Sequence, residues 1–301
     1  MNGTFGNPYL IVNPQSNRGL AKASLDLILP EMLATWPSLK VLETDRGGHA
    51  TDLALLAIAE NATVILVLGG DGTLNEVVNA MGDQCQIPLG VLPCGSGNDT
   101  AKSLGIPSET KNLVRHLLNA RVKMIDLGLV TSKTHTRYFL NVASCGISAV
   151  IAQNVRARES NLSGWAYYFE TFKAIFSFKP KQLSVDIDGK NIRHPRCSLL
   201  AFANGRYFGG GMQIAPGASL DDGRFDEIAV SNMGLGFFLR HGAKVYRGLH
   251  LELPQVYKMR GRVAKVDCIS KEPFYIETDG EDAGTLPARF EILPRCLPVL
   301  V

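Results

Sequence analysis

The 301-residue sequence lacks any apolar run long enough to span a bilayer, and it contains no block of like charges. Its first residues also lack the basic stretch and the long apolar core of a signal peptide. A formal net charge of +3 without a basic stripe gives no reason to expect nucleic-acid binding, although it is compatible with an acidic substrate. We therefore expect a cytoplasmic protein with no transmembrane segment, and we leave open a peripheral position at the inner face of the membrane.

Cysteine is too sparse and too scattered to suggest a zinc finger or a disulfide scaffold. The six cysteines form no CxxC pair and have no histidine at zinc-finger spacing, and the six histidines show no ligand spacing of their own. We interpret the cysteines as reduced thiols.

Three common phosphate-binding signatures are also absent. The sequence has no GxxxxGK[ST] loop, no complete GxGxxG fingerprint, and no HRD or DFG set. These absences exclude the P-loop NTPases, the usual dinucleotide-binding enzymes and the protein kinases.

The sequence does contain a change of pattern near residue 130, from alternating strand-like and helical runs to mainly strand-like runs. Before it, short apolar runs at 9–12, 41–44, 64–68 and 89–92 alternate with helical patterns at 20–32, 50–59, 74–81 and 113–120. This alternation predicts an α/β domain with a mostly parallel sheet over residues 1–130.

The second half, residues 131–291, is predicted to be mainly β. Strand-like runs follow one another with Asp-Gly, Asn-Gly and Gly-Gly turns between them, and helical patterns at 148–178 and 233–247 interrupt the series. The runs lie at 124–130, 138–143, 183–189, 198–205, 225–230, 262–269, 274–280 and 289–293. We expect a decorated, β-sandwich-like domain. We leave open whether the tail, about 292–301, returns to the first domain.

The most informative segment is GGDGTLNEVV at 69–78, which follows an apolar strand and restarts at once as a helix. Glycines allow close backbone approach, and the first amides of a helix point donors toward an anion. Asp71 lies among them, where a carboxylate would repel phosphate, and therefore implies a bound cation or a catalytic role. A plain glycine turn explains the glycines, but not the polar cluster that follows them.

A second loop, PCGSGND at 93–99, also ends a strand and opens a helix, so that Ser96 and nearby amides could hold phosphate oxygens. Its bland interpretation is an ordinary N-cap loop, since Ser, Asn and Asp all cap helices well. Together with Asn13-Pro14 after the first strand, the two loops should meet at the carboxyl edge of the parallel sheet.

These loops, with IVNP at the first strand, LDDGRFD at 220–226 and ETDGE at 277–281, resemble the diacylglycerol kinase catalytic family, particularly its soluble bacterial lipid kinases, which are related to sphingosine and ceramide kinases. The resemblance covers essentially the whole chain. GGDG alone also occurs in NAD kinases and phosphofructokinase relatives, but here Asn75-Glu76 directly follows GGDGTL, as in the lipid-kinase branch.

The resemblance implies an α/β nucleotide-binding domain, a β-rich domain and an active site in the cleft between them. It places the ATP contacts on the first domain. The loop at 15–19 departs from the family pattern, and its Arg18 offers a positive charge instead. The implied contact residues are Asn13, Thr44, Gly69, Gly70, Asp71, Gly72, Thr73, Glu76, Gly95 and Ser96.

The ETDGE motif carries the proposed catalytic carboxylates. Phosphorylating an alcohol requires a group that accepts the hydroxyl proton, and the resemblance implies that Glu281 is this base. Asp71, Asp279 and Asp126 would then share a magnesium ion, because clustered carboxylates need a counter-ion. Without the other motifs, a solvated acidic hairpin tip would be the preferred interpretation of this segment.

A separate magnesium loop is implied at SLDDGRFD. There, the Asp222 carboxylate and the backbone carbonyls of Ser219 and Arg224 would hold the ion. The alternative is an Asp-Gly hairpin turn without metal.

An amphipathic helix is expected near Trp165 to Phe178, with Trp165, Tyr168, Phe172, Ile175 and Phe176 on one stripe. It could dock on a membrane or line an acyl-chain cleft, but a core-facing helix is the preferred interpretation.

The combined prediction is an ATP-dependent lipid kinase that transfers the γ-phosphoryl group to a lipid hydroxyl, with diacylglycerol as first candidate, phosphatidate as product and Mg²⁺ as cofactor. Alternative acceptors are a sphingoid base, phosphatidylglycerol or, less favoured, NAD. A non-catalytic nucleotide- or lipid-sensing regulator of the same fold is the non-enzyme alternative. The sequence leaves a homodimer open.

Overall fold

The computed structural model describes residues 5–156, 174–175, 177–270 and 272–301. By its internal contacts the chain divides into two compact units. Unit 1 comprises Met1–Leu127 with Leu293–Val301, and unit 2 comprises Gly128–Ile292. The domain limits expected from the sequence, 1–130 and 131–291, remain a prediction, as does the cleft between the domains.

Unit 1 is built on a parallel sheet with the strand order β2-β1-β3-β4. Strands β1, β3 and β4 are buried along their whole length because helices cover both faces of the sheet, which is why they appear in the sequence as unbroken apolar runs. The end of β15 adds a further parallel pairing to β4, from Val299 to Leu89. The strands are β1 (Pro8–Val12), β2 (Lys40–Glu43), β3 (Val64–Gly69) and β4 (Leu89–Pro93).

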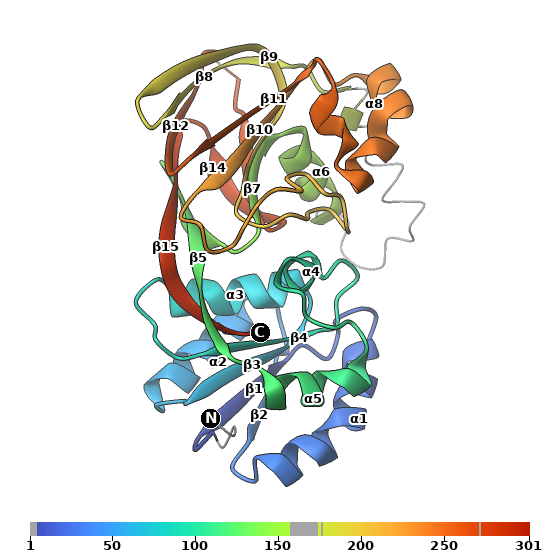
Figure 1. Cartoon of the computed structure of the whole chain (residues 1–301), viewed down its shortest axis with the longest axis vertical. Helices are drawn as coiled ribbons and strands as arrows, with labels where there is room; N and C mark the ends of the chain where they lie inside the picture. Colours follow the sequence, from blue (N-terminus) through green and yellow to red (C-terminus); the bar gives the residue numbers. More distant parts are fainter. Residues whose placement is uncertain (1–4, 157–173, 176, 271) are drawn as a thin grey trace. The chain divides into compact units, whose positions relative to one another are not determined.

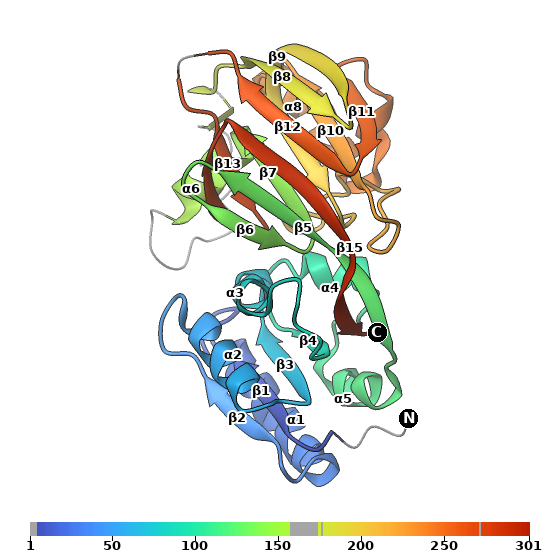
Figure 2. The same cartoon turned by 90° about the vertical axis from the view of Figure 1, so that its left-hand side faces the viewer.

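The helices of unit 1 pack in pairs on the sheet. Helix α2 packs against α3, and α1 packs against α5 on the opposite face (Figures 1 and 2). The helices are α1 (Leu20–Thr35), α2 (His49–Ala59), α3 (Asp71–Met81), α4 (Asp99–Leu104) and α5 (Thr110–Asn119). The predicted α/β architecture is therefore confirmed for this half.

Unit 2 is mainly β and its neighbouring strands run antiparallel in the order β14-β13-β7-β9-β8-β12-β15. Strand β10 pairs with β9 and β11, and β5 pairs with β6 and β15. The strands are β5 (Val122–Ser132), β6 (Thr136–Phe139), β7 (Val142–Gly146), β8 (Lys181–Ile187), β9 (Lys190–Ala203), β10 (Phe225–Ser231), β11 (Val256–Gly261), β12 (Val263–Cys268), β13 (Tyr275–Thr278), β14 (Glu281–Thr285) and β15 (Ala288–Leu300).

Helical segments decorate this β-rich unit, as the sequence predicted. They are α6 (Ile147–Arg156), α8 (Leu235–His241) and the 3-10 helices η1 (Gly242–Arg247) and η2 (Leu249–Glu252). Among the described residues, no helix is long and apolar enough to cross a membrane.

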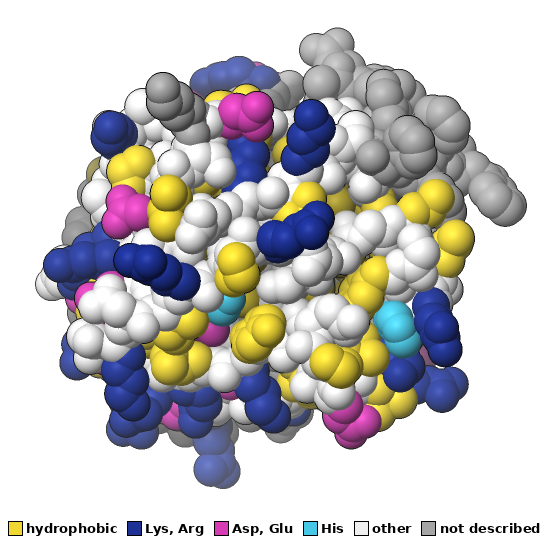
Figure 3. All heavy atoms as spheres, turned by 90° about the horizontal axis from the view of Figure 1, so that it is seen from above, with side chains coloured by type: hydrophobic (Ala, Val, Ile, Leu, Met, Phe, Trp, Pro, Cys, Tyr) yellow, Lys and Arg dark blue, Asp and Glu magenta, His cyan; other side chains and the backbone are white. Residues whose placement is uncertain are grey.

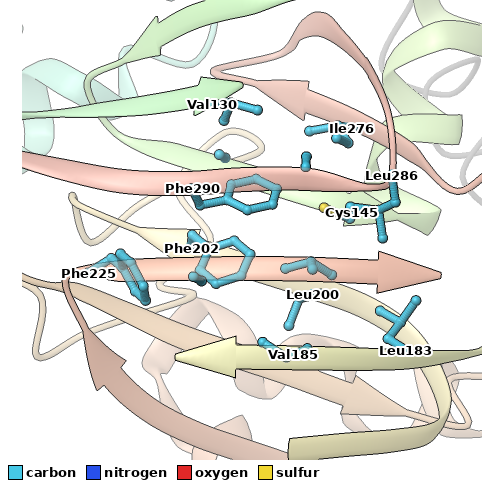
Figure 4. Packing of buried hydrophobic residues seen from close by; sticks show 14 of the residues in the cluster. Val130, Cys145, Leu183, Val185, Leu200, Phe202, Phe225, Ile276, Leu286 and Phe290 are labelled. Carbon is cyan, nitrogen blue, oxygen red and sulfur yellow. The ribbon is translucent and has the colours of Figure 1, made fainter. Parts of the chain in front are cut away.

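Strand β9 shows how the core of unit 2 is filled on both faces of one sheet. Alternate residues enter two different hydrophobic clusters, with Leu200 and Phe202 on one side and Leu199 and Ala201 on the other. In the first cluster, shown in Figure 4, the ring of Phe202 stacks on Phe290 with the centroids 4.2 Å apart. Burial on both faces explains why the second half of this strand, residues 197–203, is a nearly continuous apolar run rather than an alternating one.

The amphipathic helix expected near Trp165 to Phe178 lies largely outside the described residues, which applies to Trp165, Tyr168, Phe172 and Phe176. Of the expected stripe, Ile175 is described, and so is Phe178 at the end of the segment. Ile175 is buried in the second cluster of unit 2, and the ring of Phe178 contacts that of Phe274 edge-on at 6.0 Å. These two residues therefore face the core.

Candidate functional site

Two glycine loops of unit 1 touch each other at the ends of neighbouring strands. Strand β3 ends at Gly69 and α3 begins at Asp71, with Gly70 between them in an extended conformation. A Cβ atom placed on Gly95 would lie 2.6 Å from the Cα of Gly70, and one on Gly70 would lie 3.1 Å from the Cα of Gly95. The first distance excludes a side chain at Gly95 unless a backbone moves, and the second leaves little room for one at Gly70, because the two backbones approach closely.

Several backbone amides at these loops have no hydrogen-bond partner within the described part of the chain. They belong to Asp71, Gly72 and Thr73 in the first turn of α3, and to Ser96 and Gly97 in the second loop. Unpaired amides at a helix N-terminus, together with the helix dipole, favour an anion. The arrangement can therefore bind phosphate oxygens.

Side-chain hydrogen bonds tie the loops after β1, β3 and β4 together. The Asn13 amide nitrogen Nδ2 donates to Thr73 Oγ1 at 2.9 Å, and Ser16 Oγ donates to the Cys94 carbonyl at 2.9 Å. Asn13 Oδ1 also accepts the Gln15 amide at 3.1 Å. Asn13 thus holds the glycine loop in place. The nucleotide contact expected of Asn13 stays a prediction.

The sequence suggested that Asp71 is an uncompensated carboxylate among the glycines. In the structure, this carboxylate accepts two hydrogen bonds. Its oxygens accept the backbone amides of Asp99 at 3.1 Å and Thr100 at 3.2 Å. These amides lie in the first turn of α4, which has no side-chain cap at its own N-cap residue. Asp71 thus stabilises α4, and only the earlier amides of the second loop remain for a phosphate.

Glu76 likewise accepts backbone amides at the start of a helix, in this case α2. Its Oε1 accepts the Gly48 amide at 3.0 Å and its Oε2 accepts the Ala50 amide at 3.1 Å. Helix α2, which begins there, has no side-chain cap of its own. The nucleotide contacts expected of Glu76 and of half-buried Thr44, whose amide bonds the Val12 carbonyl at 2.8 Å, remain predictions.

In unit 2, Asp279 and Gly280 form the tight turn between β13 and β14, both with positive φ (49° and 89°). The two Asp279 oxygens accept three backbone amides, from Leu140 at 2.7 Å, Asn141 at 3.0 Å and Val142 at 2.9 Å. This carboxylate therefore fixes the link between β6 and β7. Glu281 is the first residue of β14, directly after the turn.

The sequence interpretation missed Glu277, which is 5% exposed and lies in β13. Its Oε2 accepts the Gly280 amide at 2.7 Å, and its Oε1 accepts a hydrogen bond from Ser144 Oγ. Ser144 Oγ lies 2.6 Å from Ser148 Oγ. Glu277 therefore braces the turn that leads to Glu281, and an acidic residue within an otherwise apolar strand was the signal that could have revealed it.

The residues proposed to bind magnesium have other partners in the structure. Asp126 is fully buried in β5 and its Oδ1 accepts the Arg295 amide at 2.8 Å. Asp222 accepts the amide of Arg224 at 3.1 Å and pairs with the Arg260 guanidinium. Across the described ranges, no group of three or more His, Cys, Asp or Glu side chains is arranged to hold a metal. The magnesium roles of Asp126, Asp222, Ser219 and Arg224 therefore stay predictions.

Arg260 also approaches a second carboxylate, with its Nε 3.5 Å from Asp226 Oδ1. Burial raises the pKa of Asp226, Arg260 partly opposes this rise, and the nearby Asp222 adds to it. Arg260 is thus the cation that balances two neighbouring acids beside the 220–226 loop.

Two family models match the chain. The diacylglycerol kinase catalytic domain matches residues 7–130, and the YegS C-terminal NAD kinase beta sandwich-like domain matches residues 141–301. A diacylglycerol kinase of Bacillus subtilis (strain 168) is 30% identical over 295 residues, which cover 97% of this chain and 95% of the relative. One from Staphylococcus aureus (strain JH9) is also 30% identical, over 96% of this chain and 90% of the relative.

Solved structures agree on the fold. A crystal structure of a candidate diacylglycerol kinase from Bacillus anthracis str. Sterne matches with a TM-score of 0.80 and 25% identity, covering 99% of this chain and 98% of its own. An NAD kinase from Archaeoglobus fulgidus, crystallised in complex with ATP, matches with a TM-score of 0.50 and 13% identity, covering 97% and 92%, which shows a shared fold alone. From its two matching domains and its relatives, the chain belongs to the diacylglycerol kinase family of enzymes.

Proposed function

We propose that the chain transfers the γ-phosphoryl group of ATP to a lipid hydroxyl, with diacylglycerol as acceptor and phosphatidate as product. The observation that carries the proposal is the close contact of Gly70 with Gly95, which gathers backbone amides without partners at the ends of β3 and β4. The curated relatives, which are named diacylglycerol kinases, support the choice of acceptor.

In the proposed reaction, unit 1 positions the nucleotide. The amides of Gly72, Thr73 and Ser96 hold phosphate oxygens, and the α3 dipole favours their negative charge. Asn13, held against Thr73, keeps this loop from relaxing away from the phosphates. Phosphoryl transfer depends mostly on such positioning and charge stabilisation.

Glu281 of unit 2 is proposed as the base. The acceptor hydroxyl oxygen forms a bond to the γ-phosphorus while the bond from that phosphorus to the β–γ bridging oxygen breaks and ADP leaves. Glu281 takes the proton of the hydroxyl, as a general base does in reactions of this class. Glu277 and Asp279 hold the turn that carries Glu281, so we assign them positioning roles.

Magnesium enters the proposal as part of the substrate, because the triphosphate reacts as its Mg²⁺ complex. Carboxylate oxygens are suitable ligands for this hard cation. The carboxylate oxygens of Asp71 and Asp279, however, already accept hydrogen bonds from backbone amides, and Asp222 is paired with Arg260. Among the described residues no group of acidic side chains is arranged as a preformed site for the ion, so we derive no step through one.

Two alternatives remain distinguishable. A kinase for NAD is the enzyme alternative, since an NAD kinase shares the fold, but the family model that matches unit 1 is that of diacylglycerol kinases. A sensor without turnover is the non-enzyme alternative. Neither uses Glu281 as a base toward a lipid hydroxyl.

The test compares the wild type with Glu281→Gln and with the matched control Asp282→Asn, one residue further along β14. Transfer of labelled phosphate from ATP to diacylglycerol in mixed micelles is measured, together with binding of a non-hydrolysable ATP analogue. We expect Glu281→Gln to lower turnover by about 10²–10⁴-fold and to keep analogue binding, because it removes only the proton acceptor. The control should stay near the wild type. Turnover in Glu281→Gln equal to that of the wild type would remove it as the base.

A further inference from the structure

A cap of short helices closes one end of unit 2 and leaves much of its surface to solvent. We call residues 235–252, which comprise α8, η1 and η2, the helical cap. Neither α8 nor η1 buries any side chain completely. The cap is nevertheless fixed in place, because the Val245 carbonyl accepts the Gln213 amide at 2.9 Å and His250 Nε2 bonds the Ile214 carbonyl at 3.1 Å.

Large hydrophobic side chains are exposed on this cap. Leu239 is 65% exposed, Tyr246 48% and Leu249 44%, and Tyr257 on the adjoining β11 is 53% exposed. Elsewhere among the described residues of unit 2, Ile269 alone is comparably exposed. Apolar side chains concentrated in this way mark an interaction surface rather than the usual scatter of single residues.

The helical cap also carries exposed cations. It carries Arg240, Lys244 and Arg247, all exposed, and one acidic residue, Glu252, at its end. Desolvation lowers the pKa of His241, and the charges of Lys244 and Arg240 lower it further.

The face of unit 2 seen in Figure 3 has the same mixed character. Hydrophobic side chains lie between those of Lys and Arg, and acidic side chains are few. Apolar groups interleaved with cations are the composition of surfaces that rest on an anionic bilayer, where the apolar groups enter the interface and the cations meet the lipid headgroups.

We infer that the helical cap is the surface by which this protein docks on an anionic lipid bilayer. The inference deepens the proposed function, on which its purpose rests, because a kinase with no membrane-spanning helix among its described residues must still reach a substrate held in a membrane. Docking through the cap would keep the protein at the surface while one lipid after another is phosphorylated.

The experiment measures sedimentation of the full chain with vesicles of phosphatidylcholine and phosphatidylglycerol in equal parts, and with vesicles of phosphatidylcholine alone. We expect binding to the anionic vesicles that weakens as salt is raised. Arg240→Gln/Lys244→Gln/Arg247→Gln should lower partitioning by about a hundredfold, since each cation near an anionic surface contributes roughly fivefold. Leu239→Ser should lower it about tenfold, because one leucine no longer enters the interface.

The matched control is Lys190→Gln/Arg193→Gln/Lys265→Gln, which removes the same charge from exposed positions of unit 2 outside the cap. It should bind vesicles as the wild type does. Equal losses in the two triple variants would show that net charge alone attracts the protein and would overturn the inference. The inference would also be overturned if the wild type did not bind vesicles and instead formed a dimer that Leu239→Ser dissociates, because the cap would then be a contact between two copies of the chain.

Activity separates this inference from the proposed function. The cap variants should phosphorylate diacylglycerol presented in detergent micelles at the wild-type rate, but should lose turnover on diacylglycerol in anionic vesicles. Vesicle binding through the cap without turnover on any lipid would leave the docking surface standing and contradict the kinase. Normal turnover on vesicles by the cap variants would contradict the docking surface alone.

Discussion

Asp71 accepts a hydrogen bond from the backbone amide of Thr100 at 3.2 Å, and its other oxygen accepts the amide of Asp99 at 3.1 Å. The first residue of α3 therefore caps the first turn of α4. Any substitution of Asp71 changes this link as well as the charge at the glycine loop. Loss of activity alone is thus insufficient to define its role.

The two roles of Asp71 can be separated by comparing Asp71→Ala with Asp71→Asn. Asp71→Ala should lower the free energy of unfolding by roughly 1–2 kcal/mol, the usual effect of losing a helix cap, while Asp71→Asn keeps one acceptor oxygen and should lose less. Urea unfolding measures both. Asp71→Ala with an unchanged unfolding midpoint would show that the link to α4 contributes nothing to stability.

Gly95→Ala should disrupt the contact between the two glycine loops. The new methyl group would meet the Cα of Gly70 at 2.6 Å, so one backbone must move, at a cost of roughly 1–3 kcal/mol. Affinity for an ATP analogue, measured by calorimetry, should fall with it. Gly47→Ala is the control, because a Cβ there has nothing within 4 Å. Equal affinities in both variants would contradict a nucleotide site at these loops.

The stability of unit 2 should depend on pH through His250, which is buried in the helical cap. Burial lowers the pKa of His250, and its bond to the Ile214 carbonyl offsets only part of this effect. The unfolded chain therefore binds more protons below about pH 6.5, so stability is full above that pH and is lost as the pH falls toward the lowered value.

His250→Gln keeps a donor for the Ile214 carbonyl but cannot be charged. The difference in free energy of unfolding between the wild type and this variant should therefore shrink, or reverse, between about pH 7 and pH 5. Denaturant unfolding at a series of pH values measures it. Parallel curves for the two proteins would show that His250 does not titrate on unfolding in this range.

Asp222 distinguishes a metal loop from a turn closed by Arg260. The pair is partly exposed, with side-chain exposures of 32% for Asp222 and 45% for Arg260, so Asp222→Ala should cost at most about 1 kcal/mol. If the ion pair is its main partner, the melting temperature of the wild type will not change with added Mg²⁺. A rise that disappears in Asp222→Ala would instead establish the magnesium loop.

The fold could be predicted from the sequence where both faces of a strand are covered. Strands β1, β3 and β4 are continuous apolar runs because helices bury them on both sides. Strand β11 was not predicted, since its residues are mostly exposed or half-buried and include Lys258 and Arg260. Strand β14 was missed for a similar reason, because it begins with two acidic residues.

The candidate site could be predicted only in part. The glycine loops after β3 and β4 were found because their residue types are unusual at strand ends. The partners of Asp71, Glu76 and Asp279 could not be found, because each carboxylate bonds amides that lie far away in the sequence. Only the folded chain brings such groups together. Glu277 was missed for the same reason, because its partner Ser144 lies far away in the sequence.

The measurement that tests the central claim most directly is a competition among acceptors. Labelled ATP is offered to the wild-type chain with diacylglycerol, a sphingoid base, phosphatidylglycerol and NAD together, and the products are separated by thin-layer chromatography. The account predicts that label enters a lipid, diacylglycerol first, and that Glu281→Gln abolishes this product while Asp282→Asn keeps it. Label in NAD alone, or in no acceptor, would contradict it.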